Sequence, residues 1–307
     1  MQASYTLRIG TRSSEMALFQ ARTVATRLEH CNPGLRCEVL PIETSGDRVL
    51  GKLSEYGGKG LFVRELDTAL LEERTDLSVN CLKDIPNDLE RSSGIRIGCV
   101  LRRDDVRDTL ICRSAFSETD LEQHGGRIGT SSPRRRAILS RLYPQARIID
   151  IRGNAGTRLR KLDAGDFDAI VLASAGLTRI GAQNRITRFY EHSEFLPAVG
   201  AGIISVDFAI GREQLAGVLE SINDSETFFQ MQVERALLNT LKGTCLTAVG
   251  AYTRISVGEV CVMAAVYSQD GKHEVVQTVR GNIQDEPSEL GSRLGKALLV
   301  GGAASHI

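Results

Sequence analysis

Two arginine-bearing loops of similar design are the parts of this sequence best suited to bind an anion. The first, residues 129–136, reads Gly-Thr-Ser-Ser-Pro-Arg-Arg-Arg and follows an apolar strand-like run. Ser132 is a good helix N-cap and Pro133 suits the first helical turn, so free backbone N–H groups, hydroxyls and guanidinium groups converge there. Arginine matches planar carboxylate or phosphate groups better than lysine does. On their own, the three arginines fit an anion site and a solvated helix face equally well.

A second loop of the same kind bears on the choice between an anion site and a solvated helix face. Residues 151–158 read Ile-Arg-Gly-Asn-Ala-Gly-Thr-Arg and also lead from a strand-like run into a helix. Two loops of one design at the carboxyl ends of strands favour the anion site, because ligands of open α/β sheets bind at those ends.

The composition narrows the class of ligand. The chain has 307 residues, with 38 Lys plus Arg and 38 Asp plus Glu, so its formal net charge is zero. Nucleic-acid binding normally needs a basic stripe, so we expect no nucleic-acid partner.

The seven cysteines are scattered without a C-x-x-C pair, so neither a disulfide framework nor a metal site is indicated. With no signal-peptide pattern and no apolar run of about 18 residues, we expect a cytoplasmic protein with no membrane partner.

The order of apolar runs predicts the architecture. Strand-like and helical patterns alternate up to about residue 200, which predicts an α/β fold with largely parallel sheets. Residues 8–14 (Arg-Ile-Gly-Thr-Arg-Ser-Ser) and 127–132 (Arg-Ile-Gly-Thr-Ser-Ser) are near copies, so two lobes of similar plan are expected. After about residue 222, a helix, three strand-like runs with hairpin turns and a closing helix predict a small α+β domain with a three-stranded antiparallel sheet.

Taken in order along the chain, a set of short motifs resembles the porphobilinogen deaminase (hydroxymethylbilane synthase) family of tetrapyrrole biosynthesis. The match covers nearly the whole chain, and the ordered set is more specific than any one motif. Its parts are Ile9-Gly10-Thr11-Arg12 with Gln20, Gly46-Asp47, Gly57-Gly58-Lys59-Gly60-Leu61-Phe62, Leu82-Lys83-Asp84-Ile85-Pro86, both arginine loops, Ala175-Gly176-Leu177, Leu196-Pro197-Ala198-Val199-Gly200, and Glu234-Arg235-Ala236 before Cys245.

The resemblance implies three domains. An N-terminal lobe of residues 1–103 with 201–221 and a central lobe of residues 104–200 resemble the lobes of two-domain solute-binding proteins. The third domain, residues 222–307, carries Cys245, which without the resemblance would be an incidental loop cysteine. By the same resemblance, Cys245 holds a dipyrromethane cofactor through a thioether. Four porphobilinogen units are added to it in turn with loss of ammonia, and hydrolysis frees linear hydroxymethylbilane.

The resemblance also implies a carboxylate-binding cleft between the lobes. Each porphobilinogen carries an acetate and a propionate, so the growing chain is a polyanion that arginines suit. The residues implied to bind the cofactor are Lys83, Thr130, Ser131, Arg134, Arg135, Arg152 and Gly153. The residues implied to bind substrate are Arg12, Ser14, Gln20, Arg158 and Arg179. Lys59 lies among glycines in a segment that the resemblance makes a flexible lid.

Asp84 is the predicted catalytic residue. Loss of ammonia from the substrate leaves a cation, and condensation then releases a proton. A carboxylate beside the pyrrole N–H groups can hold them, offset the positive charge and transfer the proton. Without the resemblance, residues 83–86 would be interpreted as an ordinary strand-to-turn corner in which Asp84 accepts hydrogen bonds from backbone N–H groups.

Several positions depart from the family pattern and keep two alternatives open. Asn80-Cys81 stands where His-Ser is usual, Ala201 where glutamine is expected, and Thr244 in place of a glycine. One alternative is a divergent paralogue that joins a different pyrrole or makes a shorter product. The other is a two-lobed protein that binds a polycarboxylate without catalysis, which the expected roles of Cys245 and Asp84 oppose. The expected partners are porphobilinogen and its oligomers, and the expected state is a monomer.

Overall fold

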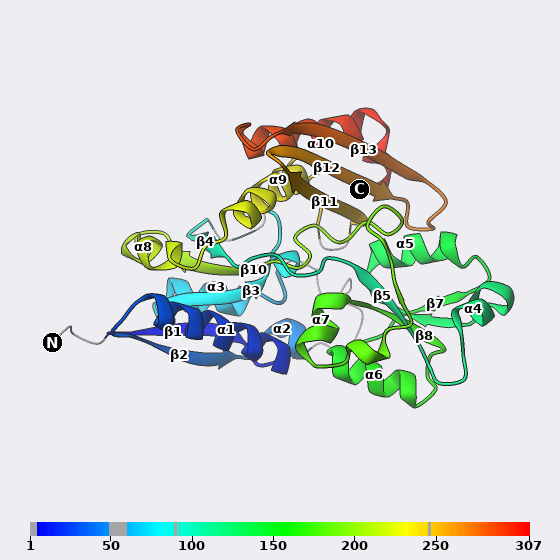
Figure 1. The fold of residues 1–307 in the computed structure, drawn as a ribbon, viewed down its shortest axis with the longest axis horizontal. Helices are drawn as coiled ribbons and strands as arrows, with labels where there is room; N and C mark the ends of the chain where they lie inside the picture. The colour runs from blue at the N-terminus through cyan, green and yellow to red at the C-terminus, as the bar shows by residue number, and fades with distance from the viewer. Residues whose placement is uncertain (1–4, 49–59, 89–90, 92, 245–246) are drawn as a thin grey trace. The chain divides into compact units, whose positions relative to one another are not determined.

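The computed structural model describes residues 5–48, 60–88, 91, 93–244 and 247–307, and its ribbon is drawn in Figure 1. The chain divides into two compact units, Met1–Asp104 with Gly200–Arg235 and Asp105–Val199 with Ala236–Ile307. Like the predicted N-terminal lobe, the first unit is built from two segments that are far apart in the sequence. The division into three domains with a boundary near residue 222 stays a prediction.

The first unit is built on a five-stranded sheet with the strand order β2-β1-β3-β10-β4. These strands are β1 (Tyr5–Arg12), β2 (Leu35–Ile42), β3 (Leu77–Cys81), β4 (Ile95–Val100) and β10 (Ile204–Ala209). The helical segments are α1 (Glu15–Cys31), α2 (Ser45–Arg48), α3 (Arg64–Leu71), η2 (Leu82–Asp84), α8 (Gln214–Glu220) and α9 (Ser225–Leu241), the last of which runs into the second unit.

The second unit contains a sheet of the same plan, with the strand order β7-β6-β8-β5-β9. Its strands are β5 (Asp108–Cys112), β6 (Arg127–Gly129), β7 (Arg147–Ile149), β8 (Ala169–Ala173) and β9 (Arg188–Phe189). Its helical segments are α4 (Glu118–His124), α5 (Pro133–Leu142), α6 (Ala155–Asp163), α7 (Ser174–Arg179) and η3 (Gln183–Arg185).

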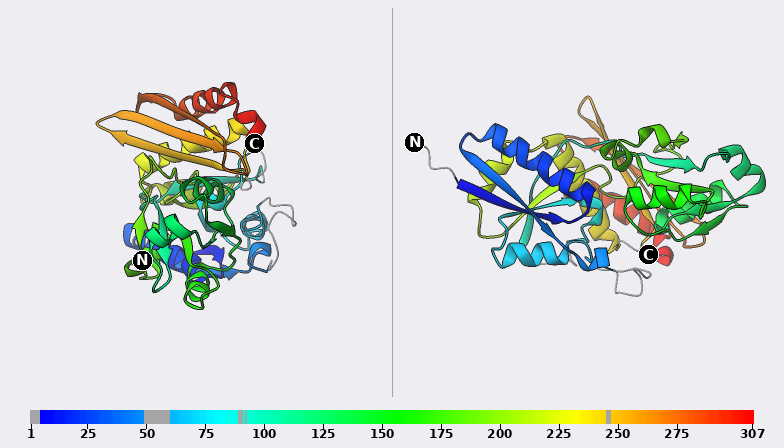
Figure 2. Two further views of the ribbon diagram at one scale, coloured as in Figure 1. Left: turned by 90° about the vertical axis from the view of Figure 1, so that its right-hand side faces the viewer. Right: turned by 90° about the horizontal axis from the view of Figure 1, so that it is seen from below.

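The predicted antiparallel sheet follows in the same unit. Strands β11 (Val249–Ser256), β12 (Glu259–Tyr267) and β13 (Glu274–Asn282) pair in sequence order, and all their pairings are antiparallel. Helix α10 (Pro287–Val300) packs against this sheet, and η4 (Ala303–His306) ends the chain (Figure 2). The predicted fold class, two α/β lobes of similar plan with a small α+β portion, is confirmed.

The expectation of largely parallel sheets is wrong for one strand of each sheet. Strand β1 is parallel to both β2 and β3, and β6 is parallel to both β7 and β8. Strand β10 is antiparallel to β3 and β4, and β5 is antiparallel to β8 and β9. The chain reaches β10 only after the whole central lobe, so no β-α-β crossover joins it to β3 and imposes a parallel direction.

Helix α1 shows why the first unit folds as it does. Ser14 caps it by accepting a hydrogen bond from the Ala17 N–H at 3.3 Å. Its buried positions 17, 21, 24 and 28 recur at the three- and four-residue spacing that places side chains on one helix face. That face packs on Leu7 and Ile9 of β1 in the main core of the unit. Strand β1 is thereby fixed, with its carboxyl end at Arg12.

The near-copy motifs build the same clamp, an arginine bound to an aspartate through backbone and side chain, at the fourth residue of β1 and at the first residue of β6. Arg8 donates from its backbone N–H to Asp76 at 2.8 Å and from Nε at 3.0 Å, while the Asp76 N–H donates to the Arg8 carbonyl at 2.8 Å. Arg127 and Asp168 repeat these contacts at 2.8, 3.1 and 2.9 Å.

Each clamp aspartate also pairs with a second arginine. Arg212 lies 2.6 Å from Asp76, and Arg113 lies 3.0 Å from Asp168. Burial opposes ionisation of both carboxyls, but the hydrogen bonds from the arginines outweigh it and hold the pKa of each at about 2. Both carboxylates therefore stabilise the folded chain as anions.

The clamps predict a pH-dependent stability. Each of Asp76→Asn and Asp168→Asn should lower the free energy of unfolding by roughly 1 kcal/mol at pH 7, because the pair is lost but its arginines are partly exposed and screened. Since the folded pKa values are depressed, this stabilisation is present above about pH 4 and is lost as the pH falls toward 2.

Urea unfolding followed by circular dichroism across this pH range measures the effect. Glu122→Gln, an exposed change on α4, is the matched control and should stay within ~0.5 kcal/mol of the parent. A deficit of Asp76→Asn that is as large at pH 2 as at pH 7 would contradict the assignment.

Candidate active site

In the first unit, Arg12 and Asp84 come together at the carboxyl ends of neighbouring strands. Strands β1 and β3 are parallel, with Gly10 opposite Ser78; Arg12 is the last residue of β1, and Asp84 lies in the turn that directly follows β3 at the same edge of the sheet. Nη1 of Arg12 lies 3.9 Å from Oδ2 of Asp84, whose side chain is 32% exposed. Asp84 accepts no hydrogen bond from the described residues, so its carboxylate does not cap the turn.

The corner that carries Lys83 and Asp84, residues 82–88, is fixed from behind by a buried contact. Leu82 is 2% exposed, and its N–H donates to the Ile203 carbonyl at 3.0 Å. Gly200 has φ +73°, and a Cβ there would stand 2.9 Å from Leu82 Cγ. Only glycine therefore fits this left-handed turn against the corner.

Two neighbouring side chains of α9 hold the segments on either side of the corner. Glu234 is fully buried, accepts from the Gly200 N–H at 2.8 Å, and pairs with Arg103 at 2.7 Å. Arg235 donates to the Pro86 carbonyl at 2.8 Å and pairs with Asp88. The Glu234-Arg235-Ala236 motif thus positions the backbone that presents Asp84.

Arg12 is itself held by two groups. Its Nε donates to Asp47 at 3.3 Å, its Nη2 donates to the other Asp47 oxygen, and its guanidinium lies 4.2 Å from the centre of the Phe62 ring. Burial opposes ionisation of Asp47, but hydrogen bonds from Arg12 and Thr44 outweigh it and lower the pKa of this carboxyl. Asp47 therefore faces Arg12 as an anion.

The other predicted residues of this unit have different surroundings. Ser14 is the N-cap of α1, and Lys83 is exposed. Gln20 is 2% exposed, and its Nε2 lies 3.1 Å from Cys81 Sγ. Gln20 thus supports the end of β3 from inside the unit. Neither Lys83 nor Asp84 forms a hydrogen bond with the residues that the structure describes.

In the second unit, both arginine loops follow parallel strands. Thr130 follows β6, with its N–H donating to the Ile149 carbonyl at 2.9 Å, and Ser131 donates to the Ile151 carbonyl at 2.5 Å. These bonds tie the two loops together at one edge of the sheet. The predicted start of α5 is confirmed, since Ser132 is its N-cap and Pro133 its first residue.

Arg134 and Arg135 are buried around one carboxylate. They are 4% and 8% exposed, and both lie 2.6 Å from Asp108, through opposite oxygens. Arg134 also donates to the Leu196 carbonyl at 2.5 Å and Arg135 to the Val171 carbonyl at 2.9 Å. The solvated-face interpretation is therefore wrong for these two arginines.

Arg136 and Asp108 complete the electrostatics of this loop. Arg136 is about one third exposed and pairs with Asp150 at 2.5 Å. Asp108 is 2% exposed, and burial opposes its ionisation, but Arg135 and Arg134 hold its pKa at about 2. The centre of the loop thus contains two cations and one anion, with a net positive charge.

The remaining predicted arginines lie in the loop and the helices that follow strands of the same sheet. Arg152 is half-buried, and its guanidinium forms no hydrogen bond or ion pair with the described part of the chain. Arg158 on α6 donates to the carbonyl of Gly153, an exposed residue, at 2.8 Å, and Arg179 is the last residue of α7. Thr130, Ser131, Arg134, Arg135, Arg152, Gly153, Arg158 and Arg179 therefore belong to the second unit, and Arg12, Ser14, Gln20, Lys83 and Asp84 to the first.

Lys59 and Cys245 lie outside the described residues. Thr244 and Thr247, which flank Cys245 and Leu246 in the sequence, are joined by two hydrogen bonds: the Thr244 N–H donates to Thr247 Oγ1 at 2.9 Å, and the Thr247 N–H donates to the Thr244 carbonyl at 3.0 Å. The two ends of this short segment are therefore held together.

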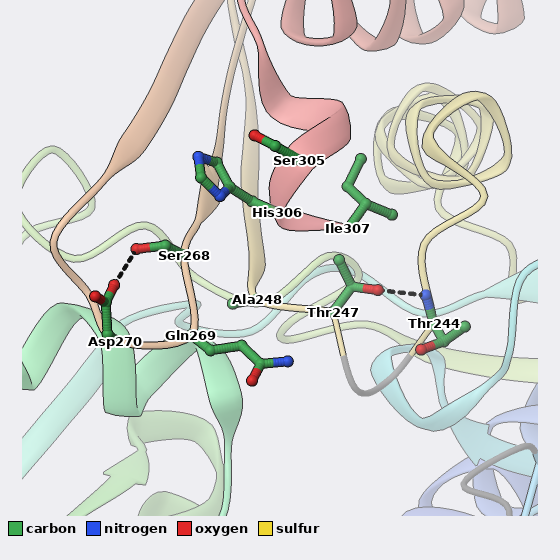
Figure 3. A pocket seen from close by; sticks show the side chains of 9 residues that line it. All are labelled: Thr244, Thr247, Ala248, Ser268, Gln269, Asp270, Ser305, His306 and Ile307. Atoms are coloured by element: carbon green, nitrogen blue, oxygen red, sulfur yellow. Dashed lines mark hydrogen bonds between the residues drawn. The ribbon is translucent and has the colours of Figure 1, made fainter.

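A cavity of about 530 Å³ adjoins these threonines (Figure 3). It lies between the segment after α9, the β12–β13 hairpin and the C-terminal turn. Its lining residues are Thr244, Thr247, Ala248, Ser268, Gln269, Asp270, Ser305, His306 and Ile307. None of these described lining residues is a lysine or an arginine.

Sequence reasoning missed two residues of the site. Asp108 belongs to no motif, although a neutral chain that buries two adjacent arginines must supply an anion to them. Asp47 stood in a recognised motif without a role. Both partners are non-local, 26 or more residues from the arginine they hold, so only the fold reveals the pairs.

Comparisons with known proteins agree with the motifs. Residues 7–217 match the family model described as "Porphobilinogen deaminase, dipyromethane cofactor binding domain", and residues 228–300 match "Porphobilinogen deaminase, C-terminal domain". The chain is 40% identical over 298 residues to a porphobilinogen deaminase of Syntrophobacter fumaroxidans, covering 97% of this chain and 95% of that protein. The chain belongs to the porphobilinogen deaminase family.

The enzyme is thus a hydroxymethylbilane synthase, a transferase of tetrapyrrole biosynthesis with a dipyrromethane cofactor. More distant matches among solved structures include the periplasmic VFT2 domain of BvgS from Bordetella pertussis, with 16% identity, a TM-score of 0.42, and coverage of 74% of this chain and 92% of that chain. Another is YtmK, a probable amino-acid transporter's extracellular-binding protein from Bacillus subtilis, with 13% identity, a TM-score of 0.43, and coverage of 75% and 97%.

The described residues fit a cofactor of this chemistry. A dipyrromethane with acetate and propionate side chains is a polyanion, so it needs donors that the protein has not already used. Nε of Arg134 is buried without a hydrogen-bond partner, and the side chains of Arg152 and Lys83 have none among the described residues. Each can donate to a carboxylate without breaking a bond within the protein.

The buried Asp108 pair predicts a large stability effect. Asp108→Asn leaves two buried guanidinium groups with no anion, so the free energy of unfolding should fall by about 3 kcal/mol. Urea unfolding at pH 7 measures it. Asp150→Asn, which removes the partly exposed partner of Arg136, is the control and should cost less than ~1 kcal/mol. Equal decreases in the free energy of unfolding of the two variants would show that burial of the Asp108 pair does not increase its contribution to stability.

Proposed function

We propose that Asp84 performs the acid–base chemistry of pyrrole condensation, with Arg12 beside it as a carboxylate-binding residue. The observation that carries the proposal is their placement: Asp84 stands at a strand end, 3.9 Å from the Arg12 guanidinium, with a carboxylate that accepts no hydrogen bond from the described residues. Such a carboxylate is free to accept the N–H of a pyrrole ring, and Nη1 of the neighbouring guanidinium, whose other edge is held by Asp47, is left to bind an acetate or propionate.

Each condensation joins the methylene carbon of one porphobilinogen to the free α-carbon of the preceding ring. The C–N bond to the aminomethyl nitrogen breaks, ammonia leaves, and the α-carbon loses its proton. Positive charge develops on the pyrrole rings during these events. Asp84 stabilises that charge through the ring N–H groups and takes part in removing the proton, a role that typically contributes 10²-fold to 10⁴-fold in rate.

Cys245 is the proposed attachment point of the cofactor. When bound, the dipyrromethane supplies the free pyrrole carbon at which the new chain begins. The residues that we propose to hold its carboxylates are Lys83, Thr130, Ser131, Arg134, Arg135, Arg152 and Gly153. Those that we propose for the substrate and growing chain are Arg12, Ser14, Gln20, Arg158 and Arg179, with Lys59 on the lid. After four condensations, hydrolysis releases linear hydroxymethylbilane.

The remaining parts of the proposal concern the state of the enzyme. We propose that it acts as a monomer in the cytoplasm, as the sequence predicts. Among the described helices, none is long and apolar enough to cross a bilayer.

The attachment of the cofactor is tested by mass. Purified protein should carry an excess mass of two linked pyrrole units on the peptide that contains Cys245, and the adduct should survive reducing agent because a thioether does not exchange with thiols. Cys245→Ser should lack the adduct, whereas Cys261→Ser, a half-buried cysteine of β12, should keep it. Parent protein that stays unmodified after incubation with porphobilinogen would favour the binding-protein alternative.

Asp84→Asn tests the catalytic role. The amide keeps the shape and some hydrogen bonding but removes the charge and the proton acceptor, so turnover should fall at least ~10²-fold in folded protein that still carries the cofactor. Asp84→Glu should retain more activity than Asp84→Asn. Single-turnover addition of porphobilinogen, with extended chains counted by mass spectrometry, measures the rate. If Asp84→Asn elongates at the parent rate and only binds substrate more weakly, Asp84 is a structural corner residue.

A further inference from the structure

We infer that Asp47 is a positioning residue for the reaction, because it competes with Asp84 for the guanidinium of Arg12. The inference rests on the proposed roles of Asp84 and Arg12. It assigns to Asp47 the task of keeping Arg12 close to Asp84 without letting the two form a closed ion pair.

The contacts of Arg12 define what Asp47 does. Asp47 takes up Nε and Nη2, one edge of the guanidinium fork, and the ring of Phe62 lies under its face at 4.2 Å. Only Nη1 is left without a hydrogen bond to the described residues, and this is the nitrogen that lies 3.9 Å from Asp84. Arg12 therefore presents one free N–H₂ group at the place where Asp84 is proposed to act.

Asp47 is in turn fixed from its own side. Thr44 donates to its Oδ2 from the hydroxyl at 2.7 Å and from the backbone N–H at 3.4 Å. The adjoining Gly46 donates from its N–H to the Leu61 carbonyl at 2.8 Å, and a Cβ at Gly46 would stand 2.3 Å from the Phe62 ring. The segments that carry Asp47 and Phe62 are therefore packed against each other. Because these two residues hold Arg12, its guanidinium has little freedom to turn.

Removal of Asp47 would change the partner of Arg12. The nearest remaining carboxylate is Asp84, and a rotation of the guanidinium would bring its fork within hydrogen-bond distance. A closed Arg12–Asp84 pair would occupy the oxygens that receive the pyrrole N–H and the proton. It would also withdraw Arg12 from substrate carboxylates. Loss of Asp47 should therefore lower kcat and raise KM together, although Asp47 touches neither substrate nor the reacting atoms.

The test compares Asp47→Asn with the conservative Asp47→Glu in single-turnover and steady-state elongation. Asp47→Asn should slow elongation by at least ~10-fold and raise KM, since a misplaced group of this kind can cost up to ~10²-fold. Asp47→Glu keeps the charge that holds the fork and should recover most of the rate. In an Arg12→Gln background, Asp47→Asn should have no further effect, because it acts only through Arg12.

A readout that does not depend on activity accompanies the kinetics. In carboxyl-labelled protein, nuclear magnetic resonance should find the pKa of Asp47 below its usual value of 3.8, and Arg12→Gln should raise it. Asp76→Asn is the matched control: it removes an aspartate that holds Arg8, four residues before Arg12 in β1, and should lower stability without changing elongation.

Three outcomes would overturn the inference: equal rates for Asp47→Asn and Asp47→Glu, an Asp47→Asn effect that persists in full with Arg12→Gln, or a pKa of Asp47 that does not respond to Arg12. These differ from a failure of the proposed function, which would appear as parent-rate elongation by Asp84→Asn with Asp47 intact.

Discussion

The ion pair between a guanidinium group and an internal carboxylate is the interaction on which this structure depends most. An arginine that is buried or half-buried at a strand end needs an anion to fix its direction and offset its charge. Asp47 does this for Arg12 in the first unit, and Asp108 does it for Arg134 and Arg135 in the second. The protein therefore holds its arginines in place before any ligand carboxylate arrives, and binding needs less ordering of long side chains.

The same pairing also appears within the strands themselves, where it has a structural use. Arg8 with Asp76 fixes the middle of β1, and Arg127 with Asp168 fixes the first residue of β6, through nearly identical hydrogen bonds. The two lobes thus share a design in which the strand is fixed by an arginine–aspartate clamp and its carboxyl end leads into a polar loop. In each clamp the aspartate is paired with two arginines of the same unit. At the carboxyl-end loops of the two sheets, Arg152, Lys83 and Nε of Arg134 keep donors for a ligand.

The sequence predicted the local features of this design well and the non-local ones poorly. The alternation of strands and helices up to about residue 200 and the three-stranded antiparallel sheet match the prediction, and the start of α5 follows from the capping preferences of Ser132 and Pro133. The direction of β10 did not follow, because its neighbour β3 lies more than a hundred residues earlier and no local pattern fixes their orientation. The partners Asp47 and Asp108 were not predicted for the same reason, because an ion pair between distant residues leaves no periodic pattern in the sequence. The resemblance supplied the proposed roles of Asp84 and Cys245, which spacing alone would have left as a turn residue and an incidental thiol.

We propose that the prearranged arginines recognise the carboxylates of the pyrrole units. The most direct measurement is elongation of cofactor-loaded enzyme with porphobilinogen and, separately, with its dimethyl ester, with the added units counted by intact mass spectrometry. The ester keeps the pyrrole ring and the aminomethyl leaving group but has no negative charge for a guanidinium to bind. We expect stepwise addition of four units from porphobilinogen and little or no addition from the ester at equal concentration. Addition of the ester at a comparable rate would show that the arginines do not select the substrate by its carboxylates.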